Sequence, residues 1–171
     1  SQQGVIVGLC SKNNSEDVDE VLNYHPEMIL AGRRLNDNMA FYIVSKVTHL
    51  MLKKRIHVNG ANILIMGLTF KENCPDLRNS RVIDLICEFE ELECNVDVYD
   101  PWVDAAMGRE NMNVNLLSIP VVGKYDAIVL AVAHDEFKKL QVEEIKSLGK
   151  NVHVLYDVKY ILEASEVDGR L

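Results

Sequence analysis

Four short apolar runs, separated by stretches with helical spacing, constrain the fold of this chain more than any other feature. They span residues 62–66, 95–99, 126–132 and 153–156. Nearly continuous apolar runs of this length are typical of strands buried on both faces of a parallel sheet. The helical stretches between them supply the crossovers that parallel strands need. The sequence therefore predicts an α/β fold, a doubly wound parallel sheet with ligands at the carboxyl ends of its strands.

The intervening elements are predicted from the same periodicity. A short additional strand is expected at 113–117, and amphipathic helices are expected at 80–89 and 142–148. Asn79 or Ser80 is the predicted N-cap of the first of these helices, because asparagine and serine side chains accept hydrogen bonds from the amides of a first helical turn.

A long helical pattern precedes the sheet. Pro26 and Glu27 suit the first turn of a helix, and apolar residues then recur every three to four positions up to about Arg55. This length is well above the ~11–12 residues of a typical globular helix, so the helix is expected to bridge domains or to pair with a partner chain. The mostly polar stretch 32–37 leaves open that the helix begins or breaks there. Three parts are predicted: an uncertain N-terminal segment (1–24), a central dimerisation helix (25–57) and a ligand-binding domain (58–171).

The composition excludes several classes of protein. The formal net charge of the chain is −8 at pH 7, and no basic stripe offers a surface for nucleic acid. No apolar run approaches the ~20 residues that span a membrane, and the N-terminus lacks the pattern of a signal peptide. We therefore expect a cytoplasmic protein with neither nucleic acid nor membrane as its partner.

The four cysteines are Cys10, Cys74, Cys87 and Cys94, and their spacing fits no metal site. Cys87 and Cys94 fall in apolar patterns and are expected to be small core residues. Free thiols in the core are typical of a reducing compartment.

The loop at 67–80, after the first predicted strand, carries two cations in an acidic chain, Lys71 and Arg78. A helix N-terminus presents free N–H groups, so two cations beside one favour a phosphate. Solvated loop cations remain the alternative. The loop is not a P-loop, and the chain contains no G-x-G-x-x-G dinucleotide fingerprint.

Two later loops add one candidate each. His134 follows the strand at 126–132 and is a proton carrier or, as we favour, a residue that caps a helix or packs a loop. Lys159 follows the last strand, where a ligand could contact it. The sequence contains no recognisable catalytic set and no predicted metal site, so the residues alone indicate a binding module.

The segment GLTFKENCPDLRNS at 67–80 closely resembles the UDP-glucose/GDP-mannose dehydrogenase family. Within that family the resemblance is greatest to bacterial UDP-N-acetylhexosamine 6-dehydrogenases. Supporting matches, in the family's order, are YHPEMI at 24–29, GRRLND at 32–37, VYDPWVD at 98–104, VAHDEF at 132–137 and DVK at 157–159. The resemblance implies a Rossmann-like UDP-binding domain.

The resemblance also implies a role for each matching residue. Phe70 and Lys71 match a pair that contacts the UDP-sugar, and Lys159 matches a basic residue that contacts the same substrate. Arg78 matches an arginine that reaches the cofactor NAD, which the other domain of the family holds. The long helix matches the central helix that joins the two domains and forms the homodimer interface.

Part of the family's apparatus has no match in this sequence. The NAD-binding domain is absent, and residues 4–10 do not match the segment around the catalytic cysteine, so Cys10 receives no catalytic role. We therefore expect the C-terminal UDP-binding fragment of an NAD-dependent nucleotide-sugar 6-dehydrogenase, which oxidises the C6 alcohol of a UDP-sugar to the uronic acid. The alternatives are a free-standing nucleotide-sugar-binding protein and a scaffold module without catalysis.

Overall fold

The computed structural model describes residues 38–104 and 114–171 of the chain. The predictions for the N-terminal segment 1–24, for the helix start at Pro26 and for Cys10 lie outside the described residues. The three-part division of the chain therefore stays a prediction.

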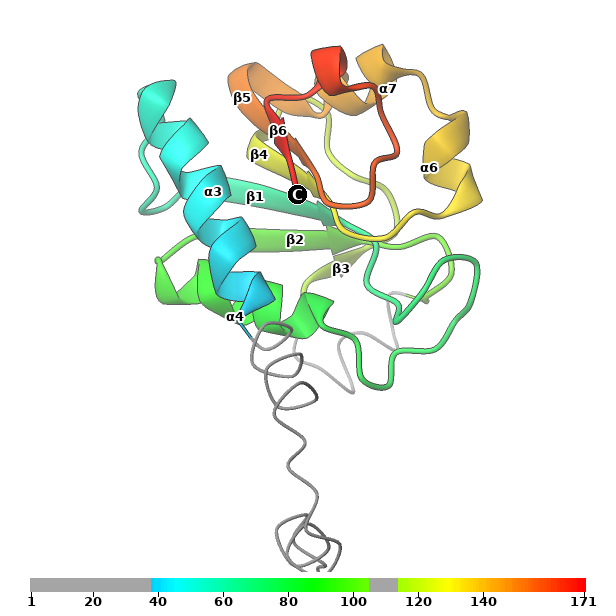
Figure 1. Ribbon diagram of the computed structural model, residues 1–171. Helices are drawn as coiled ribbons and strands as arrows, with labels where there is room; N and C mark the ends of the chain where they lie inside the picture. The colour runs from blue at the N-terminus through cyan, green and yellow to red at the C-terminus, as the bar shows by residue number, and fades with distance from the viewer. Residues whose placement is uncertain (1–37, 105–113) are drawn as a thin grey trace, which may run out of the picture. The chain divides into compact units, whose positions relative to one another are not determined.

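The described residues form a six-stranded sheet in which all strands are parallel, as Figure 1 shows. The strand order is β3-β2-β1-β4-β5-β6. The strands are β1 Asn62–Met66, β2 Asn95–Tyr99, β3 Leu116–Leu117, β4 Tyr125–Leu130, β5 Gly149–Asp157 and β6 Gly169–Arg170. The chain leaves β1 toward β2 on one side and later returns to β4 on the other, which is the topology of a doubly wound Rossmann-like fold. The predicted fold class is confirmed.

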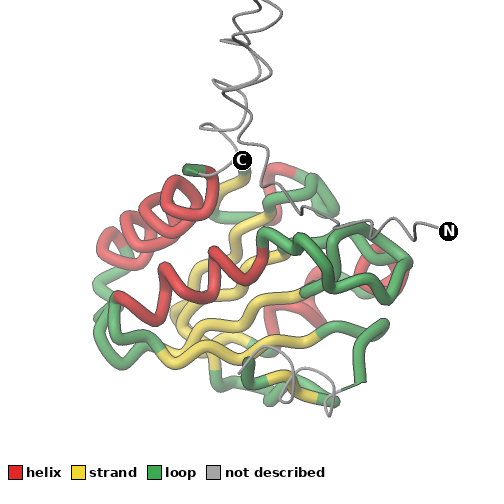
Figure 2. Tube along the Cα trace, turned by 90° about the horizontal axis from the view of Figure 1, so that it is seen from below, coloured by secondary structure: helices red, strands yellow, loops and turns green. Residues whose placement is uncertain are grey.

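Helices cover both faces of this sheet (Figure 2). The α-helices of the described residues are α3 Met39–Lys53, α4 Val82–Glu91, α6 Asp135–Lys139 and α7 Val142–Ser147, with a short 3-10 helix, η1, at Ala164–Glu166. Both α4 and the α6–α7 pair connect parallel strands. Helices were predicted at the positions of α4 and α7.

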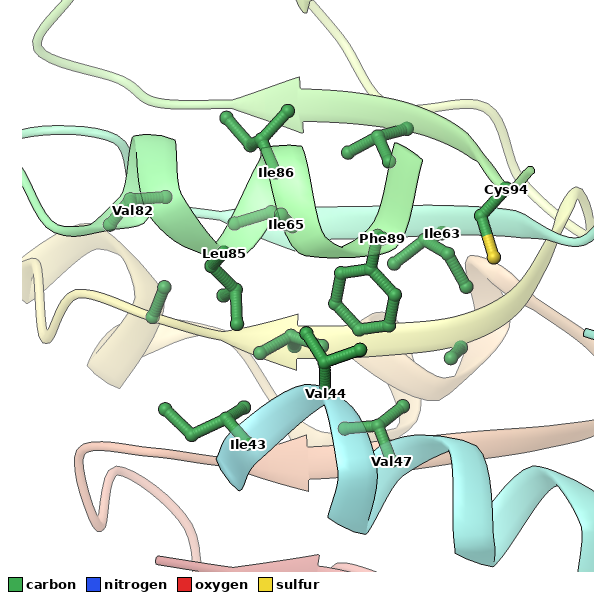
Figure 3. Close-up of a cluster of buried hydrophobic side chains, with 14 of the residues drawn as sticks. Ile43, Val44, Val47, Ile63, Ile65, Val82, Leu85, Ile86, Phe89 and Cys94 are labelled. Carbon is green, nitrogen blue, oxygen red and sulfur yellow. The ribbon is translucent and has the colours of Figure 1, made fainter. Parts of the chain in front are cut away.

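One face of the sheet packs against α3 and α4. The buried residues of α4 are Val82, Leu85, Ile86 and Phe89, which recur every three to four positions. Figure 3 shows that they meet side chains of β1, such as Ile63 and Ile65, together with Val44 and Val47 of α3. Alternate residues of the strands contribute to this cluster, because successive strand side chains point to opposite faces.

The other face packs against α6 and α7. Leu64 and Met66 of β1 lie on this face, together with Phe137 of α6 and Ile145 of α7. The strands in the middle of the sheet are therefore buried on both sides, which accounts for their continuous apolar sequences.

The helix predicted up to Arg55 is described over Met39–Lys53, and it buries one stripe against the sheet and α4. Other apolar side chains of α3 remain exposed. Phe41 is 64% exposed and Leu52 is 60% exposed. No helix among residues 38–104 and 114–171 is both long enough and apolar enough to span a membrane.

Three local predictions need correction. Cys87 is exposed, because it lies on the face of α4 opposite Leu85 and Phe89, whereas Cys94 is buried as predicted. Burial and the charge of Asp126 raise the pKa of the Cys94 thiol to about 11.

The N-cap of α4 is Arg81, not Asn79 or Ser80. Ser80 still serves the helix start, since its Oγ accepts a hydrogen bond from the Val82 N–H at 3.2 Å and donates one to the Leu68 carbonyl at 2.5 Å. Of the strand expected at 113–117, the described residues 114–117 pair as a strand only over Leu116–Leu117. Two further elements were not expected from the sequence: the helix α6, and β6, which pairs with β5 through only two residues.

Candidate functional site

The carboxyl ends of β2, β1, β4 and β5 lie level with one another. The register pairs Tyr99 with Met66, Met66 with Leu130, and Leu130 with Asp157. The loops after these residues therefore meet along one edge of the sheet, called here the carboxyl edge. The strand order reverses between β1 and β4, which is where open α/β sheets bind their ligands. All candidate residues predicted from the sequence follow β1, β4 or β5.

Gly67 brings the loop after β1 close to the end of β4. Its φ of +98° lies in the region that disfavours side chains, and a Cβ there would come within 2.9 Å of the Val132 backbone nitrogen. The Gly67 N–H donates to the Tyr99 carbonyl at 2.8 Å. Glycine is thus required here for the loop 67–80 to leave the sheet along the edge.

Phe70 and Lys71 begin a run of three exposed residues, 70–72, which is called here the tip of the loop. Phe70 is 58% exposed, although its backbone N–H is bonded to the Asp76 carbonyl at 2.8 Å. Lys71 is also exposed, and its ammonium group makes no ion pair with a described residue. An exposed aromatic ring beside an unpaired cation suits a ligand with a planar base or an anionic group.

Asp100, the first residue after β2, anchors the segment that leads to this tip. Its Oδ2 accepts hydrogen bonds from the Leu68 N–H at 2.6 Å and from the Thr69 N–H at 3.1 Å. Its Oδ1 accepts one from the Trp102 N–H at 2.8 Å. Burial alone would raise the pKa of Asp100, but hydrogen bonds from His134, Leu68 and Trp102 outweigh it and lower the pKa below its ordinary value.

His134 has no exposed side-chain surface and contacts the same loop. Its Nε2 lies 3.1 Å from Asp100 Oδ2 and 3.2 Å from Thr69 Oγ1, and its Nδ1 accepts a hydrogen bond from the Asn73 N–H at 3.0 Å. The preferred interpretation of His134 as a residue that packs a loop is confirmed. It occupies the N-cap position of α6, but its side chain makes no capping hydrogen bond.

Lys159 lies in the turn after β5. Its backbone N–H donates to Oδ1 of the buried Asp157 at 2.9 Å, and Oδ2 of the same carboxylate accepts from the Leu162 N–H at 2.8 Å. The side chain of Lys159 is exposed. Asp157 therefore shapes the turn of Lys159 as Asp100 shapes the segment before Phe70.

Arg78 lies in the same loop as Lys71 but differs in its surroundings. Its guanidinium group makes a two-point contact with Asp76, through Nε to Oδ1 at 3.0 Å and Nη2 to Oδ2 at 2.9 Å. The hydrogen bonds from Arg78 lower the pKa of Asp76 to about 2. The side chain of Arg78 is still 86% exposed. The two cations are therefore not equivalent, since Arg78 is hydrogen-bonded to Asp76 whereas Lys71 acts on Asp76 only through its charge.

Phe70–Lys71 and Lys159 follow strands that are separated by β4 alone. Neighbouring strands lie about 4.8 Å apart, so the ends of β1 and β5 are roughly 10 Å apart. One ligand of nucleotide size can contact both loops across the end of β4. The sheet order thus brings together residues that are far apart in the sequence.

A cavity of about 490 Å³ lies elsewhere, toward the amino end of β5. Its lining includes Lys54 and Lys146, but these cations are paired with Asp168 at 2.5 Å and Glu166 at 2.9 Å. Because its cations are already neutralised, this cavity is a weaker candidate for an anionic ligand than the open carboxyl edge.

Asp100, Asp157 and Asn73 were not selected from the sequence as site residues. A signal was present, since Asp100 directly follows β2, Asp157 is the last residue of β5, and Asp and Asn commonly bond to backbone amides in turns. Their three-dimensional partners, such as His134, depend on strand pairing.

Comparison with known proteins agrees with this geometry. Residues 64–164 match the model of the UDP-glucose/GDP-mannose dehydrogenase family, UDP binding domain. The chain is 55% identical over 150 residues to the UDP-N-acetyl-D-glucosamine 6-dehydrogenase of Pseudomonas aeruginosa, covering 88% of this chain and 36% of that protein. It is 49% identical to the enzyme of the same name from Salmonella typhi, covering 88% of this chain and 35% of that protein.

The fold is likewise shared with solved structures. The structure of a UDP-D-ManNAc dehydrogenase from Pyrococcus horikoshii superimposes with a TM-score of 0.67 at 26% identity, covering 81% of this chain and 31% of that one. The chain thus spans about a third of the length of the relatives it matches. From the family match, the sequence identity and the shared fold, the chain belongs to the UDP-glucose/GDP-mannose dehydrogenase family and comprises its UDP binding domain.

Proposed function

We propose that this chain is the UDP-sugar-binding part of an NAD-dependent nucleotide-sugar 6-dehydrogenase, acting on a UDP-N-acetylhexosamine. The observation that carries the proposal is the exposed Phe70–Lys71 tip, which is held on buried anchors at the carboxyl edge. The names of the two bacterial relatives, UDP-N-acetyl-D-glucosamine 6-dehydrogenase, support the sugar class.

Three residues are proposed to contact the substrate. Lys71 supplies a positive charge for the diphosphate, since it is exposed and makes no ion pair with a described residue. Phe70 offers a ring face beside it. Lys159 supplies a second cation from the far side of β4, about two strand spacings away.

NAD would accept the hydride when the C6 alcohol is oxidised. Only one contact to this cofactor is proposed for this chain, through the exposed guanidinium of Arg78. Arg78 fits this role only in part, because its guanidinium group already makes an ion pair with Asp76. The chain has no glycine fingerprint for the rest of the cofactor, and no catalytic residue is assigned to it.

A homodimer through the long helix is also proposed. Phe41, Tyr42 and Leu52 of α3 are exposed apolar residues, and burying them against a second copy would be favourable. Substitution of both Phe41 and Leu52 by glutamate should produce a monomer in sedimentation, whereas the wild-type chain should sediment as a dimer. A wild-type monomer at high concentration would contradict the dimer.

The enzyme is proposed to act in the cytoplasm, in line with its free thiols Cys74, Cys87 and Cys94.

Calorimetric titration tests the binding function. UDP and UDP-N-acetylglucosamine should bind the 171-residue chain with micromolar to millimolar affinity, which corresponds to about 4–8 kcal/mol. GDP should bind more weakly, and NAD alone should not bind measurably. Tight binding of NAD together with no binding of UDP would overturn the proposal.

A further inference from the structure

We infer that His134 is a positioning residue for the proposed UDP-sugar site, fixing from the end of β4 the loop that presents Phe70 and Lys71. This inference rests on the proposed function for its ligand, but its structural basis is independent of any ligand. That basis is a set of buried hydrogen bonds on both sides of the loop tip.

Both ring nitrogens of His134 take part in these hydrogen bonds. Because Nδ1 accepts the hydrogen bond from the Asn73 N–H, the ring proton lies on Nε2. Nε2 then has two acceptors in reach, Asp100 Oδ2 at 3.1 Å and Thr69 Oγ1 at 3.2 Å. Thr69 Oγ1 gives its own proton to the Lys71 carbonyl at 3.0 Å, so it can only accept from the histidine. The proton arrangement is therefore determined throughout the cluster.

The contact between His134 and Asn73 is reciprocal. While the Asn73 backbone N–H donates to His134, the Asn73 side-chain oxygen accepts a hydrogen bond from the Asp135 N–H at 3.0 Å. Asn73 has a positive φ of 55°, a conformation that asparagine tolerates better than most residues. The first amide of α6 is thus satisfied by the loop after β1, and the loop is fastened to the start of α6.

The loop tip is held on both flanks. Before it, Asp100 binds the amides of Leu68 and Thr69, and His134 orients that carboxylate. After it, His134 binds Asn73 directly. The three exposed residues between these anchors, Phe70, Lys71 and Glu72, are consequently set in place before a ligand arrives. A preorganised loop avoids the entropic cost of ordering itself on binding.

Other features of the described residues give weaker grounds for a functional inference. The cations around the 490 Å³ cavity are paired with carboxylates. The exposed apolar residues Ile119, Val121 and Val122 lie on a loop after β3, and nothing indicates what would cover them. His134 is the stronger candidate, because both nitrogens of its buried ring bond either to the loop itself or to Asp100, which binds the loop.

The test compares three variants of the 171-residue chain. His134→Phe keeps an aromatic ring and removes both hydrogen-bonding atoms. His134→Gln keeps one donor and one acceptor, so it can restore part of the contact. Phe137→Leu is the matched control, since the Phe137 ring packs edge-on against His134 at 5.4 Å between centroids but makes none of these hydrogen bonds.

The measurements are calorimetric affinity for UDP and amide hydrogen exchange. In His134→Phe the dissociation constant for UDP should rise about tenfold, the scale we expect when preorganisation of one contact loop is lost, while melting still shows a folded chain. Exchange at Leu68, Thr69 and Asn73 should be faster. His134→Gln should recover part of both effects, and Phe137→Leu should lower the melting temperature without changing UDP affinity.

Two outcomes separate the inference from the proposed function. If the folded His134→Phe chain binds UDP as the wild type does, or exchanges these amides no faster, the positioning role is wrong. If His134→Phe does not fold, His134→Gln decides by the same two measurements. If the wild-type chain itself does not bind UDP, the proposed function fails, and the exchange data alone then decide whether His134 holds the loop.

Discussion

His134 Nε2 and Asp100 Oδ2 lie 3.1 Å apart, and neither side chain is exposed to solvent. One follows β4 and the other follows β2, on either side of β1. Together they bind the amides on both flanks of the exposed pair Phe70–Lys71. These buried hydrogen bonds at the carboxyl edge therefore hold in place a loop segment whose own side chains are exposed.

The Asp100 carboxylate should stabilise the fold in a pH-dependent way. Its pKa in the folded chain is lower than the ordinary value of about 3.9. A lowered pKa means that the stabilisation is present above about pH 4 and is lost as pH falls through the pKa of the folded state. Asp100→Asn should cost about 1–3 kcal/mol in the free energy of unfolding at pH 7. In urea unfolding the difference from wild type should shrink below about pH 4. The same difference at pH 7 and pH 3 would contradict the assigned charge.

Gly67→Ala should destabilise the chain, because the new Cβ would meet the backbone of Val132 and the residue would keep a φ of +98°. The expected loss exceeds about 1 kcal/mol in the free energy of unfolding. Gly60→Ala is the matched control, since Gly60 also has a positive φ of +74°, but a Cβ added there would meet no described atom within 4 Å. Equal losses in thermal melting for both variants would show that the contact with Val132 is unimportant.

The Asp76–Arg78 pair predicts a measurable titration. Arg78→Ala removes the side-chain hydrogen bonds, the largest cause of the lowered pKa of Asp76, and keeps the hydrogen bond from the backbone N–H of residue 78, so this pKa should rise from about 2 toward its ordinary range. NMR titration of the side-chain carboxyl carbon would follow the change. An Asp76 pKa that stays near 2 in the variant would mean that another group sustains the shift.

Lys71 and Arg78 should differ in their effect on UDP. Lys71→Ala removes a charge-assisted contact, which typically contributes about 1.5–3 kcal/mol, so UDP affinity should fall about ten- to hundredfold. Arg78→Ala should leave UDP affinity of this chain nearly unchanged, because Arg78 is proposed to face NAD. Calorimetry with both variants decides the matter, and equal losses would reduce the loop to an undifferentiated basic patch.

The fold could be predicted from sequence wherever burial governs the residue choice. β1 and β2 have the predicted bounds, because Gly67 and the pair Asp100–Pro101 end two continuous apolar runs. β6 could not be found in this way. It has only two residues, without an apolar pattern, and its position depends on pairing with Tyr156 and Asp157.

The site was predicted less completely than the fold. Lys71, Arg78 and Lys159 were visible as cations after strands, and the structure places their loops along one edge. The sequence could not show that Arg78 is paired with Asp76 while Lys71 is not, since side-chain pairing depends on the conformation of the loop. Nor could it show that His134 and Asn73, which are 61 positions apart, would meet.

The most direct test of the central claim is to locate bound UDP by NMR. In a titration of the isotope-labelled 171-residue chain, UDP should shift the amide signals of Phe70, Lys71 and Lys159, at the carboxyl edge. Signals of His153 and Asp168, which line the 490 Å³ cavity, should not move. Shifts confined to the cavity, or none at millimolar UDP, would contradict the assignment of the UDP-sugar site to the carboxyl edge.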